Sequence, residues 1–340
     1  MRVIRLNKPG EWEAFSTPML NSSLQKGEAL LKVKKIGVCG TDLHAFRGSQ
    51  PFFNYPRILG HELAVEVMDI AEDVSNVSVG NLCCVEPYYN DIIGQAARRG
   101  KTNCGEHLQV LGVHVDGGMQ DYFIYPAKFL HPSTILSDDQ LVLIEPLAIG
   151  SHAVDSAQIL KEDIVLVIGA GPIGLSTILF AKLSGARIIV MDIDDDKIEK
   201  CKKITGISET INAKGDVIKS LNKMLNGDLP TVVLDATGNS ESMMNTFNYV
   251  AAGGTIVFIG LFTGDVTFND PNFHKKELTL KASRAAMSGD FKKIIDLMES
   301  GKIDATSFIT HRIKFDEVIT EFEKLYTYNG DLIKAVVEMD

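Results

Sequence analysis

Three short segments in the first half of the chain carry side chains that can bind a metal ion. They are Cys39-Gly40-Thr41-Asp42-Leu43-His44, Gly60-His61-Glu62 and Glu145-Pro146. Taken singly, each has an ordinary explanation, because Cys39 can pack in a core, His61 can lie in a turn and Glu145 can begin a helix. Together they supply a thiolate, an imidazole and carboxylates, the ligands of a catalytic zinc ion with one open coordination position. Such an ion acts as a Lewis acid on the hydroxyl group of an alcohol.

Two side chains in the first segment could carry away the proton that an alcohol loses on oxidation. Thr41 follows Cys39 by two residues, so its hydroxyl group can lie beside the metal ion. His44 could then pass the proton outward to solvent, by way of a cofactor's ribose. We therefore predict Thr41 and His44 as a proton relay.

A second constellation near the middle of the chain is typical of dinucleotide binding. The segment Gly169-Ala170-Gly171-Pro172-Ile173-Gly174 follows an apolar strand pattern and opens a helix pattern, which is the context that this glycine motif requires. Its glycines permit a tight turn, a close approach to a pyrophosphate, and packing of the helix on the strand. The next strand pattern ends in Asp192, 23 residues after Gly169. A carboxylate there can bond both ribose hydroxyls and would repel a 2′-phosphate, so the sequence favours NAD over NADP.

Each part of this motif has an alternative explanation. Glycine-rich turns also occur structurally and in methyltransferases, and Asp192 could merely cap the helix that follows it. A methyltransferase, however, would explain neither the metal-binding side chains nor the spacing to Asp192.

The elements that must position these residues change in character near residue 147. Before it, β patterns with frequent turns predominate, at residues 30–38, 62–68 and 80–85. After it, strand patterns (163–168, 187–192, 231–234, 255–259) alternate with helix patterns (146–160, 173–184, 195–205, 216–225, 240–249). This alternation predicts a parallel sheet covered by helices on both faces. The tail predicts a helix over 292–300, then a short strand and a final helix.

Bulk properties limit the classes of protein that fit. A chain of 340 residues suits two domains. The net charge of −10 argues against nucleic-acid binding. The N-terminus lacks the apolar core of a signal peptide, and no apolar run approaches the roughly 20 residues that span a bilayer. The five scattered cysteines fit a reducing compartment, so we expect a cytoplasmic protein without nucleic-acid or membrane partners.

The ordered motifs resemble the medium-chain dehydrogenase/reductase superfamily, and within it the zinc-dependent sorbitol (polyol) dehydrogenase-like branch, which includes sugar-acid dehydrogenases. The resemblance spans nearly the whole chain, because it continues through Asp116-Gly117-Gly118, Ile144-Glu145-Pro146-Leu147, Asp235-Ala236-Thr237-Gly238 and residues 276–284. It implies an α/β protein with a GroES-like, β-rich catalytic domain and a Rossmann domain with a doubly wound parallel sheet. The first would comprise residues 1–147 completed by 286–340, and the second residues 148–285.

The resemblance also implies roles for single residues. Cys39, His61 and Glu62 would bind zinc, and Glu145 would lie near zinc, binding it directly or through water. Arg284 would reach toward the substrate and these carboxylates, although an ordinary ion pair is the alternative. The residues expected at the cofactor are Gly169, Gly171, Pro172, Ile173, Gly174, Asp192, Ile193, Lys197, Thr237, Gly260 and Ser283. Further candidates for the substrate pocket are Phe46, Tyr55, His114 and Met119, with His114 equally suited to a surface loop.

One departure from the family concerns a second, structural zinc ion. Many relatives hold it with four cysteines around an Arg-Arg-Gly stretch. Aligned on residues 98–100, the first three of those positions hold Asp91, Gly94 and Ala97, and the fourth falls at or beside Cys104. One thiolate cannot build such a site, so we predict a single, catalytic zinc ion per chain. The other three thiols, Cys83, Cys84 and Cys201, fall inside a strand and a helix and are interpreted as structural.

The sequence therefore predicts an oxidoreductase that transfers a hydride from a secondary alcohol of a polyol, sugar or sugar acid to NAD+, giving a ketone. Three alternatives remain open: a zinc-dependent alcohol dehydrogenase acting on simple alcohols, a zinc-free reductase, and a non-catalytic dinucleotide-binding sensor. The metal-binding side chains count against the zinc-free reductase, and the proton relay counts against the sensor. Family analogy predicts a homodimer or homotetramer.

Overall fold

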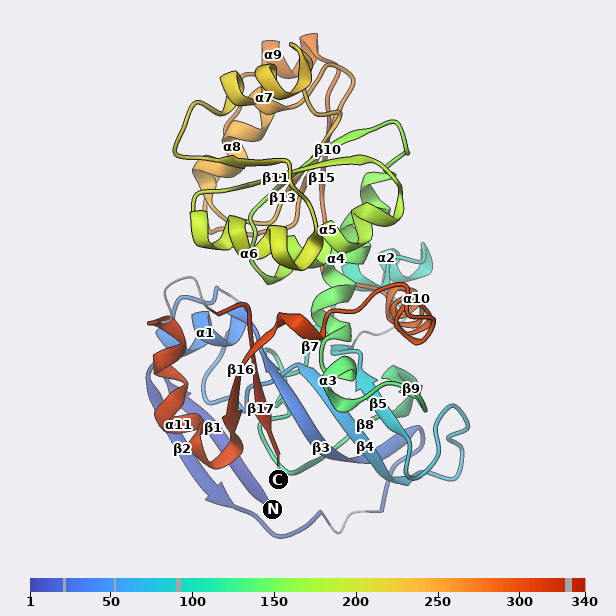
Figure 1. The fold of residues 1–340 in the computed structure, drawn as a ribbon. Helices are drawn as coiled ribbons and strands as arrows, with labels where there is room; N and C mark the ends of the chain where they lie inside the picture. The colour runs from blue at the N-terminus through green and yellow to red at the C-terminus, as the bar shows by residue number, and fades with distance from the viewer. Residues whose placement is uncertain (21–22, 52, 90–92, 328–331, 340) are drawn as a thin grey trace. The chain divides into compact units, whose positions relative to one another are not determined.

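The computed structural model describes residues 1–20, 23–51, 53–89, 93–327 and 332–339. The chain divides into two compact units, shown as a ribbon in Figure 1. The first unit comprises Met1–Glu145 together with Ala286–Asp340, and the second comprises Pro146–Ala285. The tail of the chain thus returns to the unit in which the chain began.

The first unit is built on a seven-stranded sheet with the order β16-β17-β3-β4-β5-β9, in which β8 also pairs with β3. Its strands are β3 (Glu28–Val38), β4 (Glu62–Ile70), β5 (Leu82–Val85), β8 (Tyr122–Pro126), β9 (Leu130–Ser133), β16 (Ile309–Lys314) and β17 (Lys334–Glu338). Two small pairs accompany it: β1 (Arg2–Lys8) with β2 (Glu11–Ser16), and β6 (Tyr88–Tyr89) with β7 (Gln109–Val110). Leu31, Val33 and other alternate residues of β3 are buried, as a period of two along a strand requires. This burial confirms the predicted β-rich character of the first unit.

Among its described residues, this unit also has five α-helices. They are α1 (Gly40–Arg47), α2 (Gln95–Arg98), α3 (Asp138–Leu141), α10 (Ser288–Glu299) and α11 (Val318–Glu321). The predicted order of the tail, a helix, a short strand and a further helix, is found in α10, β16 and α11. The strand β17 follows them and was not predicted; it pairs in parallel with β16 and antiparallel with β3. Successive residues of β17 are all buried (Lys334, Ala335, Val336 and Val337), so its sequence does not show the alternation that predicts a strand.

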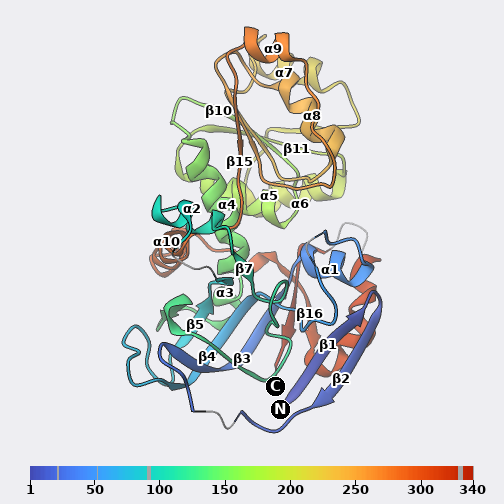
Figure 2. The same ribbon diagram turned by 180° about the vertical axis from the view of Figure 1, so that it is seen from behind.

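The second unit is a six-stranded parallel sheet with the order β12-β11-β10-β13-β14-β15. The strands are β10 (Ile164–Ile168), β11 (Arg187–Asp192), β12 (Thr210–Asn212), β13 (Val232–Asp235), β14 (Thr255–Phe258) and β15 (Thr279–Ala282). The helices are α4 (Ile144–Ala157), which begins in the first unit, α5 (Pro172–Leu183), α6 (Asp195–Thr205), α7 (Val217–Leu225), α8 (Ser240–Tyr249) and α9 (Asp270–Lys275). Within this unit α5 and α6 lie on one side of the sheet, and α7 and α8 on the other, in both views (Figures 1 and 2). Helices on both faces explain why β10 and β13 read as continuous apolar runs.

The order of the sheet reverses between β10 and β13, because β11 and β12 follow on one side of β10 while β13, β14 and β15 follow on the other. Such a reversal leaves a crevice at the carboxyl ends of the strands, where parallel α/β sheets bind ligands. The predicted α/β class, with a doubly wound sheet, is confirmed. Among the described residues, none of the helices is both long and apolar enough to cross a membrane.

Candidate functional site

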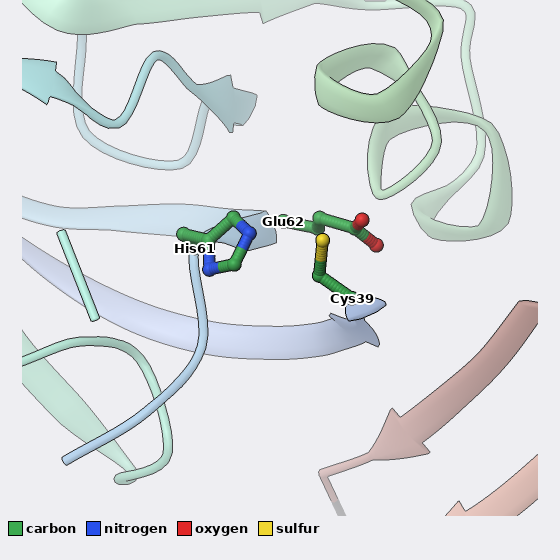
Figure 3. Close-up of side chains that lie close together, drawn as sticks. All are labelled: Cys39, His61 and Glu62. Carbon is green, nitrogen blue, oxygen red and sulfur yellow. The ribbon is translucent and has the colours of Figure 1, made fainter. Parts of the chain in front are cut away.

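The metal-binding side chains of the first unit come from the adjoining ends of two neighbouring strands. Cys39 follows the last residue of β3, and His61 and Glu62 stand at the start of β4. The antiparallel register places Gly37 opposite Glu62, which brings these two chain segments together. One ligand atom from each of Cys39, His61 and Glu62 lies within 4.8 Å of the others. Figure 3 shows these three side chains close together. The structure therefore brings together three of the residues that the sequence singled out for zinc.

A glycine-rich brace fixes the turn that presents His61. Gly60 has φ of +96°, a left-handed conformation that favours glycine, just before His61. Gly117 packs so closely that a Cβ atom on it would lie 2.6 Å from the carbonyl oxygen of Leu59, and Gly118 donates a backbone hydrogen bond to the Gly60 carbonyl (2.9 Å). The Asp116-Gly117-Gly118 motif thus packs against the turn that carries His61 and supplies no metal ligand itself.

Asp42 is the buried carboxylate behind the imidazole ring. Its Oδ2 accepts the backbone N–H of Cys39 (2.9 Å), and its Oδ1 lies 3.7 Å from His61 Nδ1. Both Oδ1 and Nδ1 are buried and have no hydrogen-bond partner among the described residues. Burial raises the pKa of Asp42. Burial opposes a charge on His61, but the negative charges of Asp42 and Cys39 outweigh it and raise the pKa of His61 well above its usual range.

This donor set fits a zinc ion. A metal-binding histidine commonly turns one ring nitrogen to a carboxylate behind it and the other to the metal, and Asp42 is placed for that part. Sulfur, nitrogen and carboxylate oxygen are also the atoms that zinc prefers in catalytic sites. Within the described ranges, Cys39, His61 and Glu62 form the one group of three or more such residues with this geometry.

Glu62 forms a buried ion pair that the sequence analysis did not foresee. Lys334 Nζ lies 2.6 Å and 2.7 Å from the two carboxylate oxygens, and also donates to the Val38 carbonyl oxygen (3.1 Å). Burial by itself would lower the pKa of Lys334, but the Glu62 charge outweighs burial and raises it. Gly37 leaves the room for this carboxylate, because a Cβ atom there would lie 2.8 Å from the Cβ of Glu62. Glu62 is therefore held as a charged carboxylate at the edge of the metal site.

Glu145, at the start of α4, is the third buried carboxylate here, after Asp42 and Glu62. Burial raises its pKa to about 7, and the nearby Glu62 charge adds to this, whereas His61 and a hydrogen bond from Tyr88 oppose it. Tyr88 Oη donates that bond to Glu145 Oε1. Glu145 lies outside the group of three within 4.8 Å, so direct binding and binding through water both remain predictions.

The remaining predicted catalytic residues lie in different surroundings. Thr41 is half-buried in the first turn of α1, whereas His44 is exposed and its Nδ1 lies 3.2 Å from Ser49 Oγ. Arg284 is exposed and follows β15, the last strand of the second unit. Their catalytic roles stay predictions.

The four candidate pocket residues also separate. Met119 is fully buried in the hydrophobic core of the first unit, and Phe46 packs against that core from its edge. Tyr55 Oη donates to the carbonyl oxygen of Ala45, so its hydroxyl group has a partner within the protein. His114 Nδ1 accepts the backbone N–H of Val110 (3.0 Å), as expected for a histidine in a turn.

The glycine motif of the second unit has the geometry that its sequence predicts. Gly169 has φ of +99°, and α5 begins at Pro172 after the cap residue Gly171. A Cβ atom on Gly174 would lie 2.7 Å from the carbonyl carbon of Gly169, so the helix approaches the turn more closely than any side chain allows. The free N–H groups at the start of α5 suit a pyrophosphate.

The other expected cofactor residues lie where parallel strands end. Asp192 ends β11, and Thr237, Gly260 and Ser283 closely follow the ends of β13, β14 and β15, which are paired in register. Ile193 and Lys197 follow β11, in the turn into α6 and in its first turn. Asp192 is nearly buried, and its two oxygens accept the backbone N–H groups of Ala170 (2.7 Å) and Asp194 (2.9 Å). Each carboxylate oxygen has a second lone pair, so Asp192 can hold the glycine turn and still accept ribose hydroxyls.

The region of the expected structural-zinc lobe is organised without a cluster of thiols. Asp91 lies outside the described residues. A Cβ atom on Gly94 would lie 2.9 Å from the carboxyl carbon of Glu106, whose Oε1 accepts the backbone N–H of Gln95 (3.0 Å) at the start of α2. Cys104 is an exposed free thiol. A glutamate therefore occupies the space beside Gly94, and the absence of a structural zinc ion stays a prediction.

Three site residues escaped the sequence analysis: Asp42, Tyr88 and Lys334. Asp42 stood inside a quoted motif, where its spacing from Cys39 is that of a capping residue. Lys334 interrupts the apolar run before Ala335, and a lysine there is a sign of a buried partner. Tyr88 carries no local sign, because its partner is 57 residues away in the chain.

Comparisons with known proteins agree with this geometry. Residues 25–135 match the family model of the alcohol dehydrogenase GroES-like domain, and residues 172–300 match that of the zinc-binding dehydrogenases. The chain is 39% identical to L-galactonate-5-dehydrogenase of Escherichia coli K12, with 99% of this chain and 98% of that protein covered. It is 30% identical to D-xylulose reductase of Scheffersomyces stipitis, with 96% and 95% covered. A crystal structure of the alcohol dehydrogenase RspB from Escherichia coli CFT073, complexed with NADH, superposes with a TM-score of 0.93 at 28% identity, covering 99% of both chains.

Proposed function

This chain belongs to the zinc-dependent medium-chain dehydrogenases, and we propose that it oxidises a secondary hydroxyl group of a sugar acid or polyol with NAD+ as the hydride acceptor. A secondary alcohol and NAD+ then give a ketone, NADH and a proton. The relatives named for a sugar acid and a sugar ketone support this substrate class. So does the polarity of a site that holds three buried carboxylates, Asp42, Glu62 and Glu145.

The observation that carries the proposal is the group of half-buried Cys39 and buried His61 and Glu62, with ligand atoms within 4.8 Å of one another. These residues would hold the zinc ion, with Glu145 beside it. Zinc, when bound, supplies a Lewis acid that lowers the pKa of a hydroxyl group. Asp42, whose Oδ1 lies 3.7 Å from His61 Nδ1, would orient the imidazole, and Lys334 compensates the charge of Glu62.

The chain's own polar residues would manage the substrate and the proton. Thr41 lies in the first turn of α1, two residues from Cys39, where its hydroxyl group can receive the proton. His44, exposed on the same helix, would pass it to solvent. Arg284 would bind a carboxylate or several hydroxyl groups of the substrate, since a guanidinium group suits both.

NAD would bind along the carboxyl ends of the strands in the second unit. The turn Gly169–Gly174 and the start of α5 would hold the pyrophosphate, and Asp192 the adenosine ribose. The acidic residues 194–196 after Asp192 oppose a 2′-phosphate, which supports NAD rather than NADP.

The first experiment measures NADH formation by the purified protein across sugar acids, polyols and simple alcohols, with NADP+ as the parallel acceptor. Turnover confined to sugar acids or polyols supports the proposal, and turnover confined to simple alcohols supports a general alcohol dehydrogenase. A zinc-loaded protein that binds NADH but turns over none of these compounds would favour a dinucleotide-binding sensor.

The matched variant is Cys39→Ser, which removes the thiolate and changes little else. It should lose zinc, measured by atomic absorption, and turnover, while still binding NADH, measured by fluorescence. Cys104→Ser, at an exposed free thiol, is the control and should change neither. Full zinc content in Cys39→Ser would contradict the metal assignment.

We also propose that the protein acts in the cytoplasm as a homodimer or homotetramer. The five free cysteines support a reducing compartment. β15 is the end strand of its sheet and carries the partly exposed Leu280, so it could pair with a second copy. Light scattering coupled to size-exclusion chromatography would give the number of chains.

A further inference from the structure

Tyr88 is a buried tyrosine whose hydroxyl group contacts the carboxylate of Glu145. Glu145 lies beside the metal site but outside the group of Cys39, His61 and Glu62. The Tyr88 side chain is 5% exposed, and Tyr88 Oη donates a hydrogen bond to Glu145 Oε1. We propose that Tyr88 is a positioning residue of the zinc centre, because it holds one oxygen of Glu145 and leaves Oε2 for the metal ion or its water. This inference rests on the proposed function, since it assumes that zinc binds at Cys39 and His61.

The ring of Tyr88 is itself held in place. It packs edge-on against Phe291, with ring centroids 6.3 Å apart and an angle of 69°. Phe291 is fully buried in α10 and stacks on His131 at 5.2 Å. A tyrosine supported in this way keeps one rotamer, so its hydroxyl group stays in one position. The tail that returns to the first unit therefore helps to place a residue of the zinc centre.

A buried hydrogen-bond network holds this support in turn. Glu86 Oε2 lies 2.9 Å from His131 Nε2 and accepts the hydroxyl group of Ser288 at 2.6 Å. Ser288 is the first residue of α10, the helix that carries Phe291. The chain of contacts from Glu86 to Glu145 thus passes through the rings of His131, Phe291 and Tyr88, with a carboxylate at each end.

The two carboxylates of the site are held in chemically different ways. Glu62 faces an ammonium group, with Lys334 Nζ 2.6 Å and 2.7 Å from its two oxygens. Glu145 faces the neutral hydroxyl group of Tyr88, which orients one oxygen and brings no positive charge. A neutral donor brings no cation of its own, whereas a lysine already compensates the charge of its carboxylate. Tyr88 therefore fixes the direction of Glu145 and leaves the balancing cation to come from the metal site.

A purely structural explanation also exists, because a buried tyrosine needs some acceptor for its hydroxyl group. The test must therefore use readouts that a structural loss leaves unchanged. Tyr88→Phe keeps the ring against Phe291 and removes only the oxygen atom. Tyr125→Phe is the matched control, since Tyr125 is equally buried and its hydroxyl group donates to the Glu86 carbonyl oxygen (3.0 Å). Tyr89→Phe, at the exposed neighbour on β6, is the second control.

The first readout is the metal itself. We expect Tyr88→Phe to release zinc to a chelator about tenfold faster than the wild type, because a hydrogen bond to a buried charged group is lost. The visible spectrum of the cobalt-substituted protein should shift. The substrate panel should show a fall of about tenfold or more in kcat with a smaller change in KM. Tyr125→Phe should lower the Tm while leaving the zinc release rate and the cobalt spectrum as in the wild type.

The second readout is coupling to Glu145. In a Glu145→Gln background, Tyr88→Phe should cause no further change in zinc release, because the group that Tyr88 positions is already altered. Additive effects of the two substitutions, or a Tyr88→Phe protein that matches Tyr125→Phe in metal release and spectrum, would overturn the inference. If the wild type holds no zinc, or Cys39→Ser keeps it, the proposed function fails. If zinc depends on Cys39 but not on Tyr88, only the present inference fails.

Discussion

Lys334 provides the sharpest test of how the metal site is supported. Its ammonium group lies 2.6 Å and 2.7 Å from the oxygens of Glu62, and the two residues are 4% and 1% exposed. Lys334→Met keeps an unbranched side chain of similar length and removes the charge and its hydrogen bonds. Glu62 would then be a buried carboxylate without its cation.

The expected cost is large because the pair is buried. Removing one member of a buried ion pair costs about 3–5 kcal/mol, since the remaining charge is uncompensated. For a unit of this size, each kcal/mol shifts the Tm by about 2–4 °C, so the Tm should fall by about 6–20 °C. The double variant Lys334→Met with Glu62→Leu should recover most of this loss, because neither charge then remains in the core.

The change in Tm is measured by thermal unfolding, with circular dichroism as the signal. It is measured on zinc-loaded protein and on protein from which a chelator has removed the zinc. The fall should be larger without zinc, because a bound metal ion would give Glu62 another cation. Lys314→Met, at an exposed lysine that ends the neighbouring strand β16, is the control and should shift the Tm by no more than about 2 °C. The reasoning is refuted if metal-free Lys334→Met unfolds within 2 °C of the wild type, or if the double variant loses as much as the two single variants together.

Three further outcomes are expected. Gly37→Ala should lower both the Tm and the zinc content, because the new Cβ would lie 2.8 Å from that of Glu62; unchanged zinc content would show that the carboxylate can move aside. Asp192→Ala should weaken NAD+ binding about tenfold or more. It should also reduce the preference for NAD+ over NADP+, measured as the ratio of the two kcat/KM values. An unchanged ratio would mean that the residues after Asp192 select NAD+ over NADP+. Asp139→Asn should cost on the order of 1–2 kcal/mol in the free energy of unfolding at pH 7, because Arg312 chiefly lowers the pKa of Asp139 to about 2. A carboxyl with a lowered pKa stabilises the fold above its unfolded pKa of about 4 and loses that effect as the pH falls toward 2. The free energies of unfolding of the wild type and the variant, from urea titrations, should therefore converge near pH 2. An equal difference between them at every pH would mean that charge is not the cause.

Local sequence patterns predicted most elements of the second unit. The predicted strands and helices between residues 163 and 259 coincide with those from β10 to β14 within one or two residues at each end, because buried apolar strands and amphipathic helices repeat at different periods. The short strands β12 and β15 were missed, since both include polar residues and neither has the continuous buried run of β13 and β14. The C-terminal strand β17 was also missed, since its buried residues do not alternate with exposed ones.

Single residue types and their spacing indicated the chemistry. Cys39, His61 and Glu62 lie within short motifs that can be recognised in the sequence. A thiolate, an imidazole and a carboxylate that occur together are typical ligands of a metal ion. The glycine motif and Asp192 likewise depend on backbone conformation and spacing, which are local properties. The identity of the chemistry was therefore readable before the fold.

What holds those residues in place was decided by the tertiary structure alone. Lys334 meets Glu62 across 272 residues, and Tyr88 meets Glu145 across 57. Both meetings depend on strand register and on the return of the tail to the first unit, and one sequence carries no local pattern that specifies either. The sequence by itself thus determined which ligands and which cofactor turn the protein has. The charges and hydrogen bonds around them were settled only when distant strands paired, because burial and proximity are properties of the packed chain.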